Sequence, residues 1–168
     1  AERDVDLHND IENTLRILDR RIRIANVSIE REYDKELPKI CANGSELNQV
    51  WTNLIDNAVD AMAEDSSGRP RVLRIRTARK LDRVVVELFD TGPGVPPSLR
   101  DRIFEPFFTT KKQGDGTGLG LDVVRRIVQR HHGELRLESA PGRTCFQVIL
   151  PVRRPRAGDS DASASTAS

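Results

Sequence analysis

The sequence predicts an α/β fold, and two kinds of hydrophobic pattern carry that prediction. Apolar residues recur at the spacing of one helix face in residues 4–25, 43–62 and 118–131. Apolar and polar residues alternate, as in half-buried strands, in residues 27–33, 71–79, 83–90, 134–138 and 144–150. Helical and strand patterns therefore interleave along a chain of 168 residues, a length that is typical of one domain.

The helix that begins near Asn43 is the most informative element. Asn43 is a suitable N-cap, and Glu46 three residues later completes the pattern of a capping box. Asn53 and Asn57 are four residues apart and project from one face, with Asp60 close to that face. Amide and carboxylate oxygens in line suit a hard cation such as Mg²⁺, although a solvated polar face has the same composition. The apolar stripe of the helix consists of Leu47, Val50, Trp51, Leu54, Ile55, Ala58, Val59 and Met62.

Residues 4–25 are predicted to form a single helix, in which His8 is interpreted as a surface or capping side chain. Residues 97–104 are predicted to form a short helix with Pro97 in its first turn. In the last helix the side chains expected to face inward are Leu119, Val123, Ile127 and Val128.

The last helix is predicted to end at His131 and His132, with Gly133 at the C′ position, and both histidines are interpreted as structural. Two hairpins are expected, one across residues 80–82 and the other across Pro141–Gly142. The arginines of residues 71–79 are interpreted as charged protection of a sheet edge and not as contacts to nucleic acid.

Composition limits the classes of function. Charged residues make up 32% of the chain and the net charge is +1, so no overall field directs the protein towards nucleic acid. Aromatic residues make up only 4%, which leaves few platforms for stacking bases. Cys41 and Cys145 are far apart and are interpreted as free thiols in a reducing compartment, with a disulfide left open.

The chain is interpreted as cytoplasmic, because it contains no apolar run of transmembrane length and no visible signal peptide. A membrane anchor elsewhere in a longer parent protein is left open. Residues 1–152 are predicted to form the domain, and the Ala/Ser/Asp-rich residues 153–168 a disordered tail.

Two glycine-containing loops frame residues 90–121. DTGPG begins with the acidic Asp90 at a strand end, and GTGLG lies just ahead of the last helix. Glycine lets a backbone approach a ligand closely, and a helix N-terminus binds phosphate, so the pair of loops indicates a nucleotide site. Alone, the first loop could be a type II turn and the second a helix N-cap region. The polar residues 109–115 between them are the predicted lid.

Four motifs occur in order along the chain: NLIDNAVDAM, DTGPGVP, IFEPFFTTK and GTGLGL. They resemble the N, G1, F and G2 boxes of the catalytic, ATP-binding domain of sensor histidine kinases, which belongs to the Bergerat-fold ATPase group. The FFTTK form of the third motif resembles the nitrogen-regulation type of sensor kinase. The resemblance extends from Leu7 to Pro151. It implies a two-layer α/β sandwich, in which a mixed sheet carries helices on one face and a flexible lid covers ATP.

The resemblance implies roles for particular residues. Asp90 would accept a hydrogen bond from the adenine amino group, and Gly92 and Gly94 would let the chain pass close to the base. Asn57 would bind Mg²⁺. The complete predicted nucleotide-binding set is Asn53, Asn57, Asp90, Gly92, Gly94, Thr110, Lys111, Gly116, Thr117, Gly118, Leu119 and Gly120.

Asn53 and Lys111 are the predicted catalytic residues. Asn53 stands where hydrolytic members of the group carry a glutamate, and an amide cannot act as a general base, so the resemblance favours phosphoryl transfer over hydrolysis. Lys111 would place a mobile positive charge near the phosphates. Asp60 stands where many sensor kinases have a basic residue, which leaves Lys111, Lys112 or an arginine to supply that charge.

The function implied is the ATP-binding half of a histidine protein kinase. It would donate the γ-phosphoryl group of ATP to a histidine on a separate dimerisation domain, from which a response-regulator receiver domain would take it. The parent protein is expected to be a homodimer without a nucleic-acid partner. His8 is followed by Asn9 and not by an acidic residue, so no acceptor histidine is identified in this chain. The alternatives are a Bergerat-fold ATPase that drives conformational change and a non-catalytic interaction module.

Overall fold

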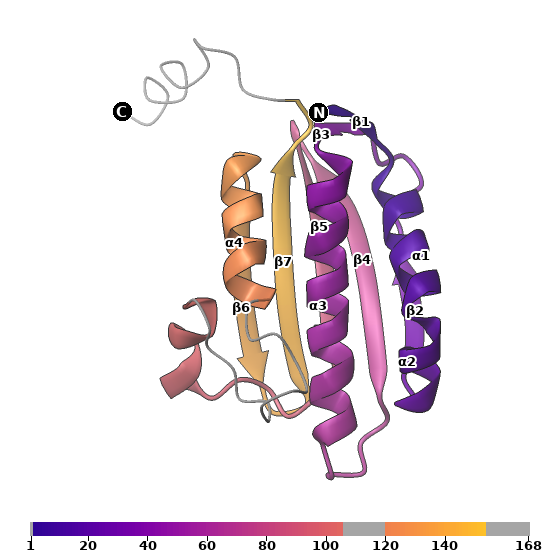
Figure 1. Ribbon diagram of the computed structural model, residues 1–168, viewed down its shortest axis with the longest axis vertical. Coiled ribbons are helices and arrows are strands. Elements are labelled where there is room, and N and C mark those ends of the chain that lie inside the picture. Colours follow the sequence, from indigo (N-terminus) through magenta and orange to yellow (C-terminus); the bar gives the residue numbers. More distant parts are fainter. Residues whose placement is uncertain (1, 106–119, 154–168) are drawn as a thin grey trace.

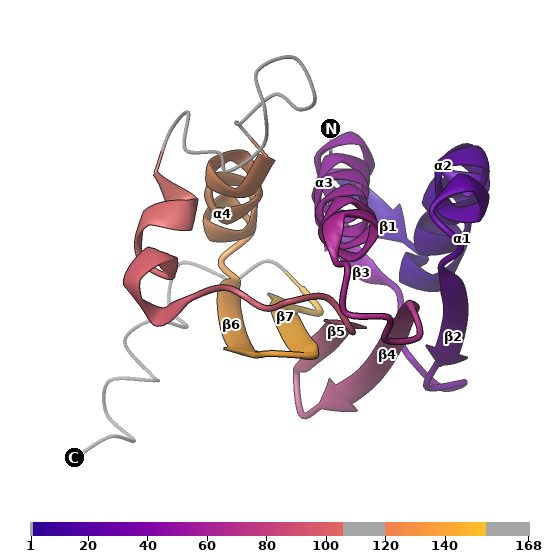
Figure 2. The same cartoon turned by 90° about the horizontal axis from the view of Figure 1, so that it is seen from below.

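Five strands form a mixed sheet, and the helices lie against one face of it (Figures 1 and 2). The computed structural model describes residues 2–105 and 120–153. In chain order its elements are β1 (Arg3–Val5), α1 (Leu7–Ile17), α2 (Asp19–Ile24), β2 (Ser28–Glu32), β3 (Ile40–Ala42), α3 (Gly44–Glu64), β4 (Val72–Lys80), β5 (Arg83–Asp90), the 3₁₀ turns η1 (Pro97–Leu99) and η2 (Arg102–Phe104), α4 (Gly120–Arg130), β6 (Glu134–Ala140) and β7 (Arg143–Pro151).

The strand order across the sheet is β2-β4-β5-β7-β6. β2 runs parallel to β4, and the other neighbouring pairs are antiparallel. β1 and β3 form a separate antiparallel pair. The predicted α/β sandwich is confirmed, as are both hairpins. The predicted lid, residues 109–115, lies outside the described residues, and so does the predicted tail beyond Arg153.

The core fills the space between the helices and the covered face of the sheet. Every residue of the predicted stripe in α3 is buried, and Trp51 is 0% exposed. A fully buried side chain of this kind contributes about 1.5–3 kcal/mol to stability. In α4, Ile127 and Val128 are buried as predicted and Val123 is partly buried against the core, while Val124, which the prediction omits, is fully buried. The sheet contributes Leu73, Ile75, Val84, Val86, Leu88, Phe146, Val148 and Leu150.

The prediction of one helix over residues 4–25 is wrong. Arg3–Val5 form a strand, and Asp6 then caps α1 by accepting a hydrogen bond from the Asn9 N–H at 3.2 Å. Leu18, with φ −90° and ψ 5°, separates α1 from α2. Hydrophobic spacing did not reveal the break, because the buried stripe continues across it through Leu7, Ile11, Leu15 and Ile22.

His8 attaches α1 to the sheet, which corrects its interpretation as a surface or capping residue. Its ring stacks on Tyr33 with centroids 4.3 Å apart and an interplanar angle of 13°. Its Nε2 lies 2.7 Å from Oγ1 of Thr77 on β4, and that oxygen also accepts a hydrogen bond from the Asp34 N–H at 2.9 Å. Burial lowers the pKa of His8, while the carboxylates of Asp6, Asp34 and Glu12 act to raise it.

The arginines of β4 do not protect a sheet edge as predicted, because β4 lies between β2 and β5. Arg74 and Arg76 project from the uncovered face of the sheet and pair with glutamates of β2. The nitrogen–oxygen distances are 3.0 Å for Arg74 to Glu30 and 4.0 Å for Arg76 to Glu32. Exposed pairs of this kind contribute about 0–1 kcal/mol each.

α4 ends in a Schellman motif that is shifted by one residue from the prediction. His132, with φ 60°, occupies the C′ position, and the N–H of Gly133 at C″ donates to the Val128 carbonyl at 2.9 Å. Gly133 is needed for a different reason. A Cβ atom at this position would lie 2.3 Å from the carbonyl oxygen of Ile149 on β7.

His131 joins the end of α4 to the beginning of α3. Its Nδ1 lies 2.9 Å from the Ile127 carbonyl oxygen, and its Nε2 accepts a hydrogen bond from the Asn43 N–H at 3.1 Å. The predicted N-cap is confirmed, because Asn43 Oδ1 accepts from the Glu46 N–H at 3.2 Å. The capping box is only half formed, since the Glu46 carboxylate pairs with Arg130 of α4.

The helix predicted for residues 97–104 is present as two 3₁₀ turns, η1 and η2. Phe104 at the end of η2 lies against α4, with the guanidinium carbon of Arg125 5.7 Å from its ring centroid. This contact joins η2 to α4, the elements on either side of residues 106–119, which lie outside the described residues.

Cys41 and Cys145 are free thiols, as the sequence interpretation favoured. Burial raises the pKa of Cys145 to about 12. In the part of the chain that the structure describes, no helix combines the length and the hydrophobicity needed to span a membrane.

Candidate nucleotide-binding site

Asp90 ends β5 and faces the helical layer. Strand alternation places it on the same side as Val86 and Leu88, and only 5% of it is exposed. Among the described residues, the one hydrogen bond to its carboxylate comes from the Gly92 N–H, which lies 2.9 Å from Oδ1. Burial raises the pKa of Asp90 to about 6, and the Gly92 N–H acts to lower it. The carboxylate is therefore ionised near neutral pH and able to accept a further donor.

The loop after Asp90 lies tightly against the β6–β7 hairpin. Gly94 has φ +84°, and a Cβ atom there would lie 2.7 Å from the Ala140 carbonyl oxygen, so only glycine fits. The next residue, Val95, donates its N–H to Ser139 Oγ at 2.7 Å. These two contacts fix the position of the main chain of this loop next to Asp90.

The two amides of α3 face the beginning of α4. Asn53 Nδ2 donates to the Gly120 carbonyl at 3.2 Å. A Cβ atom on Gly120 would lie 3.6 Å from Asn57 Nδ2, so α4 begins in van der Waals range of both side chains. Ala61, one turn after Asn57, comes within 3.5 Å of the position a Cβ atom of Gly92 would take. One face of α3 therefore touches both glycine-containing segments.

Asp60 is turned towards α2. Arg21 of α2 pairs with Asp56 and, at 2.5 Å, with Asp60 Oδ1. The expectation that Asp60 shares the face of Asn53 and Asn57 is corrected in this respect: its carboxylate takes part in a link between α2 and α3.

The structure brings together the predicted site residues that it describes. Asp90, Gly92 and Gly94 form one side of the site, and Asn53, Asn57 and Gly120 form the other. The remaining predicted residues, Thr110, Lys111, Gly116, Thr117, Gly118 and Leu119, lie outside the described residues.

The sequence did not reveal the residues that hold the loop after Asp90 through hydrogen bonds to its main chain. The Gly92 carbonyl accepts hydrogen bonds from the Gly142 N–H at 3.0 Å and from Arg69 Nη1 at 3.3 Å. The sequence predicts Pro141–Gly142 only as a hairpin turn. The signal for a turn was present, but nothing in the sequence indicated what the turn would contact.

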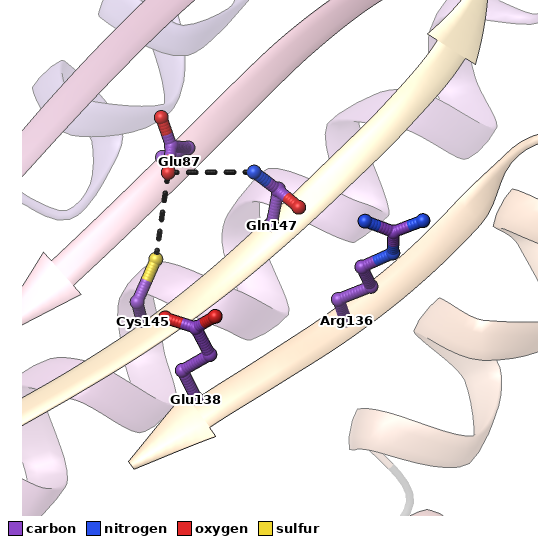
Figure 3. A pocket seen from close by; sticks show the side chains of 5 residues that line it. All are labelled: Glu87, Arg136, Glu138, Cys145 and Gln147. Carbon is purple, nitrogen blue, oxygen red and sulfur yellow. Dashed lines mark hydrogen bonds between the residues drawn. The ribbon is translucent and has the colours of Figure 1, made fainter. Parts of the chain in front are cut away.

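A small hollow lies on the uncovered face of the sheet (Figure 3). It is a hollow of about 80 Å³. Pockets for drug-sized ligands are about 300–1,000 Å³, so this hollow is too small for a nucleotide. It is lined by Glu87, Arg136, Glu138, Cys145 and Gln147.

The donor set fits a magnesium ion that arrives with a nucleotide. Within residues 2–105 and 120–153, no three His, Cys, Asp or Glu side chains are grouped so as to hold a metal by themselves. Mg²⁺ in phosphoryl-transfer sites commonly takes one or two protein ligands and completes its shell with phosphates and water. The Asn57 amide beside Gly120 offers one such ligand.

Comparison with known families identifies the family to which the chain belongs. Residues 42–154 match the model of the histidine kinase-, DNA gyrase B- and HSP90-like ATPases, and this range contains both sides of the site. The chain belongs to this ATPase family. Its use of ATP follows from that membership.

The relatives place the chain within the family. It is 37% identical over 139 residues to the sensory histidine kinase/phosphatase NtrB of Escherichia coli O157:H7, a match that covers 77% of this chain and 38% of the relative. It is 39% identical over 137 residues to NtrB of Rhodobacter capsulatus, covering 76% of this chain and 38% of the relative. The chain is thus a sensor histidine kinase ATP-binding domain of the nitrogen-regulation type. It spans 38% of the length of these curated relatives.

Solved structures agree with the fold. The catalytic domain of histidine kinase ThkA superposes with a TM-score of 0.80 at 30% identity, over 92% of this chain and 97% of that one. Full-length ShkA in complex with AMPPNP superposes with a TM-score of 0.79 at 27% identity, over 94% of this chain and 32% of that one. ThkA in complex with the response regulator TrrA gives 0.73 at 27% identity, over 90% of this chain and 42% of that one.

Proposed function

We propose that this domain binds Mg-ATP and donates its γ-phosphoryl group to a histidine on a separate dimerisation domain of the parent kinase. The observation that carries the proposal is the buried carboxylate of Asp90 at the end of β5, with glycine backbone on one side and the amides of α3 nearby. The domain proper is residues 1–152.

Each side of the site has a distinct role in the proposal. Asp90, ionised above about pH 6, accepts the adenine amino group and discriminates against guanine, which presents a carbonyl there. Gly92 and Gly94 keep the main chain close to the base. Asn57 is the protein ligand for Mg²⁺, which neutralises phosphate charge when it is bound. Glycine backbone from 116 to 120, with Thr117 and Leu119, would surround the phosphates at the start of α4.

One feature favours transfer over hydrolysis. Asn53 cannot act as a general base for water, and its amide donates to the Gly120 carbonyl, which suits a role in positioning the start of α4. Phosphoryl transfer depends mainly on positioning and on stabilisation of charge. Lys111, with Thr110 beside it, is the proposed source of positive charge near the phosphates.

The partners proposed for the parent protein follow from its relatives. NtrB is named a sensory histidine kinase/phosphatase, and ThkA has been solved with a response regulator. We therefore expect a histidine-bearing dimerisation domain within a homodimeric parent and a response-regulator receiver domain as the phosphoryl acceptor.

The test is phosphotransfer in trans. The 168-residue chain is incubated with the separate dimerisation domain of its parent and ATP labelled at the γ-phosphate. We expect acid-labile label on the dimerisation domain, none on this chain, and loss of labelling with Asp90→Asn. Binding of Mg-ATP with strong steady-state hydrolysis and no labelled histidine would favour the conformational ATPase instead. No binding at all would favour an interaction module.

A further inference from the structure

The carbonyl of Gly92 is a meeting point of three segments that are distant in sequence. The Gly142 N–H, from the β6–β7 turn, donates to it at 3.0 Å. Arg69, from the loop after α3, donates to it through Nη1 at 3.3 Å. Gly142 also lies under the Arg69 side chain, since a Cβ atom there would be 3.4 Å from Arg69 Nε. The guanidinium therefore covers the turn and binds the loop at once.

The loop that carries Arg69 is itself held in place. Asp65, just after α3, accepts hydrogen bonds from the Ser67 N–H at 3.1 Å and from the Ser67 hydroxyl at 2.9 Å. Ser67 Oγ in turn accepts the Arg69 N–H at 3.2 Å. The Asp65 carboxylate also lies 3.6 Å from Arg69 Nη1, which orients the guanidinium. Arg69 is thus presented by a hydrogen-bonded turn and not by a free chain.

The contact reaches Asp90 through a single residue. Gly92 has no side chain to restrict its backbone, so its orientation depends on what holds its two peptide groups. The carbonyl in the peptide group that Gly92 shares with Pro93 is held by Arg69 and Gly142, and the N–H in the peptide group that it shares with Thr91 donates to Asp90 Oδ1, 2.9 Å away. Among the described residues, this N–H is the one hydrogen-bond donor to the Asp90 carboxylate. Its direction therefore affects the orientation of the carboxylate.

We propose that Arg69 is a positioning residue for adenine recognition, which fixes the Gly92 peptide and through it the Asp90 carboxylate. The inference rests on the proposed function of the site. Arg69 is 38% exposed on the side chain, and it acts without touching the base in this scheme.

The Gly92 N–H favours the ionised form of Asp90, so loss of Arg69 raises the pKa of Asp90 above its value of about 6. On β7 the residue opposite Asp90 is Thr144, which has no titratable group in this range, and Cys145 lies on the uncovered face of the sheet. Nucleotide affinity should fall at low pH as Asp90 becomes protonated. A shift in the pH at which this fall occurs therefore reports on the hydrogen bond between Gly92 and Asp90.

The experiment measures Mg-ADP affinity by calorimetry from about pH 5 to about pH 8, a range that spans the expected ionisation of Asp90. It compares the wild-type chain with Arg69→Ala, Arg69→Lys and Arg69→Gln, and uses Arg20→Ala on α2 as the matched surface control. In parallel, the Gly92 amide proton is followed by NMR in the ligand-free proteins over the same pH range.

For Arg69→Ala we expect affinity at neutral pH to fall about two- to tenfold, the equivalent of one hydrogen bond. The midpoint of the acid limb and of the Gly92 amide titration should both move to higher pH. Arg69→Lys and Arg69→Gln keep a hydrogen-bond donor, so they should restore the affinity and the pH midpoints in part. Arg20→Ala should match the wild type.

Three results would overturn the proposal. One is unchanged affinity in Arg69→Ala. Another is weaker affinity with an unmoved acid midpoint, which would make Arg69 a purely structural residue. The third is a Gly92 amide titration that is the same in all variants. If the wild type binds no Mg-ADP, the proposed function fails, and the ligand-free NMR titration still decides whether Arg69 controls Asp90. Should Arg69→Ala not fold, the Lys and Gln variants carry the comparison.

Discussion

At the scale of the residue, the buried carboxylate of Asp90 determines the charge and the hydrogen-bonding capacity of the candidate site. Asp90 is 5% exposed, and the described residues give it one hydrogen bond, from the Gly92 N–H. Its pKa of about 6, raised from 3.8 by burial, means that the ionised form is disfavoured in the folded protein. The folded chain therefore holds a carboxylate at the cost of stability, which is the pattern expected of a group kept for binding.

Asp90→Asn should stabilise the ligand-free protein near pH 8 while removing its response to nucleotide. The sign follows from linkage: a folded pKa above the unfolded one destabilises the ionised protein at pH values above both. The gain should be roughly 1–3 kcal/mol, the scale of a shift of about two pH units. Thermal melts with and without Mg-ADP check both parts. A variant that melts lower than the wild type, or that keeps the full nucleotide-induced rise, would contradict the role given to Asp90.

At the scale of the element, the side chain of His131 joins the end of α4 to the beginning of α3, beside the ion pair of Glu46 with Arg130. His131 Nε2 accepts the Asn43 N–H at 3.1 Å, while its Nδ1 lies 2.9 Å from the Ile127 carbonyl oxygen. The same turn holds His132 in a left-handed conformation, with φ 60°. The two adjacent histidines are therefore expected to affect stability in opposite directions. His131 links two helices, and His132 bears backbone strain.

His131→Ala should destabilise the domain, and His132→Gly should stabilise it. The first change leaves the Asn43 N–H without its partner, at a cost of about 1–2 kcal/mol. The second relieves a left-handed residue, but glycine is more flexible when unfolded, so the net gain is at most about 1 kcal/mol. Urea denaturation of the two single variants measures both. Equal midpoints for the wild type and His131→Ala would show that the link contributes nothing.

Local signals in the sequence located the elements well. The Asn43 cap and the buried stripe of α3 depend on residues a few positions apart, so their pattern is visible in one stretch. The break at Leu18 was missed, because the apolar stripe runs on through it. Arg74 was placed at an edge because the parallel pairing of β2 with β4 has no local signature.

Only part of the candidate site could be predicted from the sequence. Asp90 and Asn57 were found through motifs whose composition reflects the chemistry of a bound nucleotide. Their assignment to adenine and Mg²⁺ stays a prediction. Arg69 and the Gly142 turn were not found, since they are 23 and 50 residues from Gly92 and act through a backbone carbonyl that any residue possesses.

At the scale of the whole molecule, two titratable groups, the half-buried His8 and the buried Asp90, give stability opposite dependences on pH. Burial lowers the pKa of His8 below 6.5, so protonation favours the unfolded chain and stability is lost as pH falls below 6.5. Burial raises the pKa of Asp90 from 3.8 to about 6, so protonation favours the folded chain and stability is gained as pH falls through about 6. The groups facing His8 are Asp6, which caps α1, Glu12 on α1, and Tyr33, Asp34 and Thr77 on the sheet side.

Single variants should separate the two effects. His8→Gln removes the destabilising protonation, so its melting temperature relative to the wild type should be higher at about pH 5 than at about pH 8. Asp90→Asn removes the stabilising protonation, so the same difference should have the opposite sign. Because His8 lies between α1 and β4, away from the nucleotide side of α3, His8→Gln should leave Mg-ADP affinity at neutral pH unchanged. A pH profile of His8→Gln parallel to that of the wild type would mean that the His8–Thr77 contact does not couple protonation to folding.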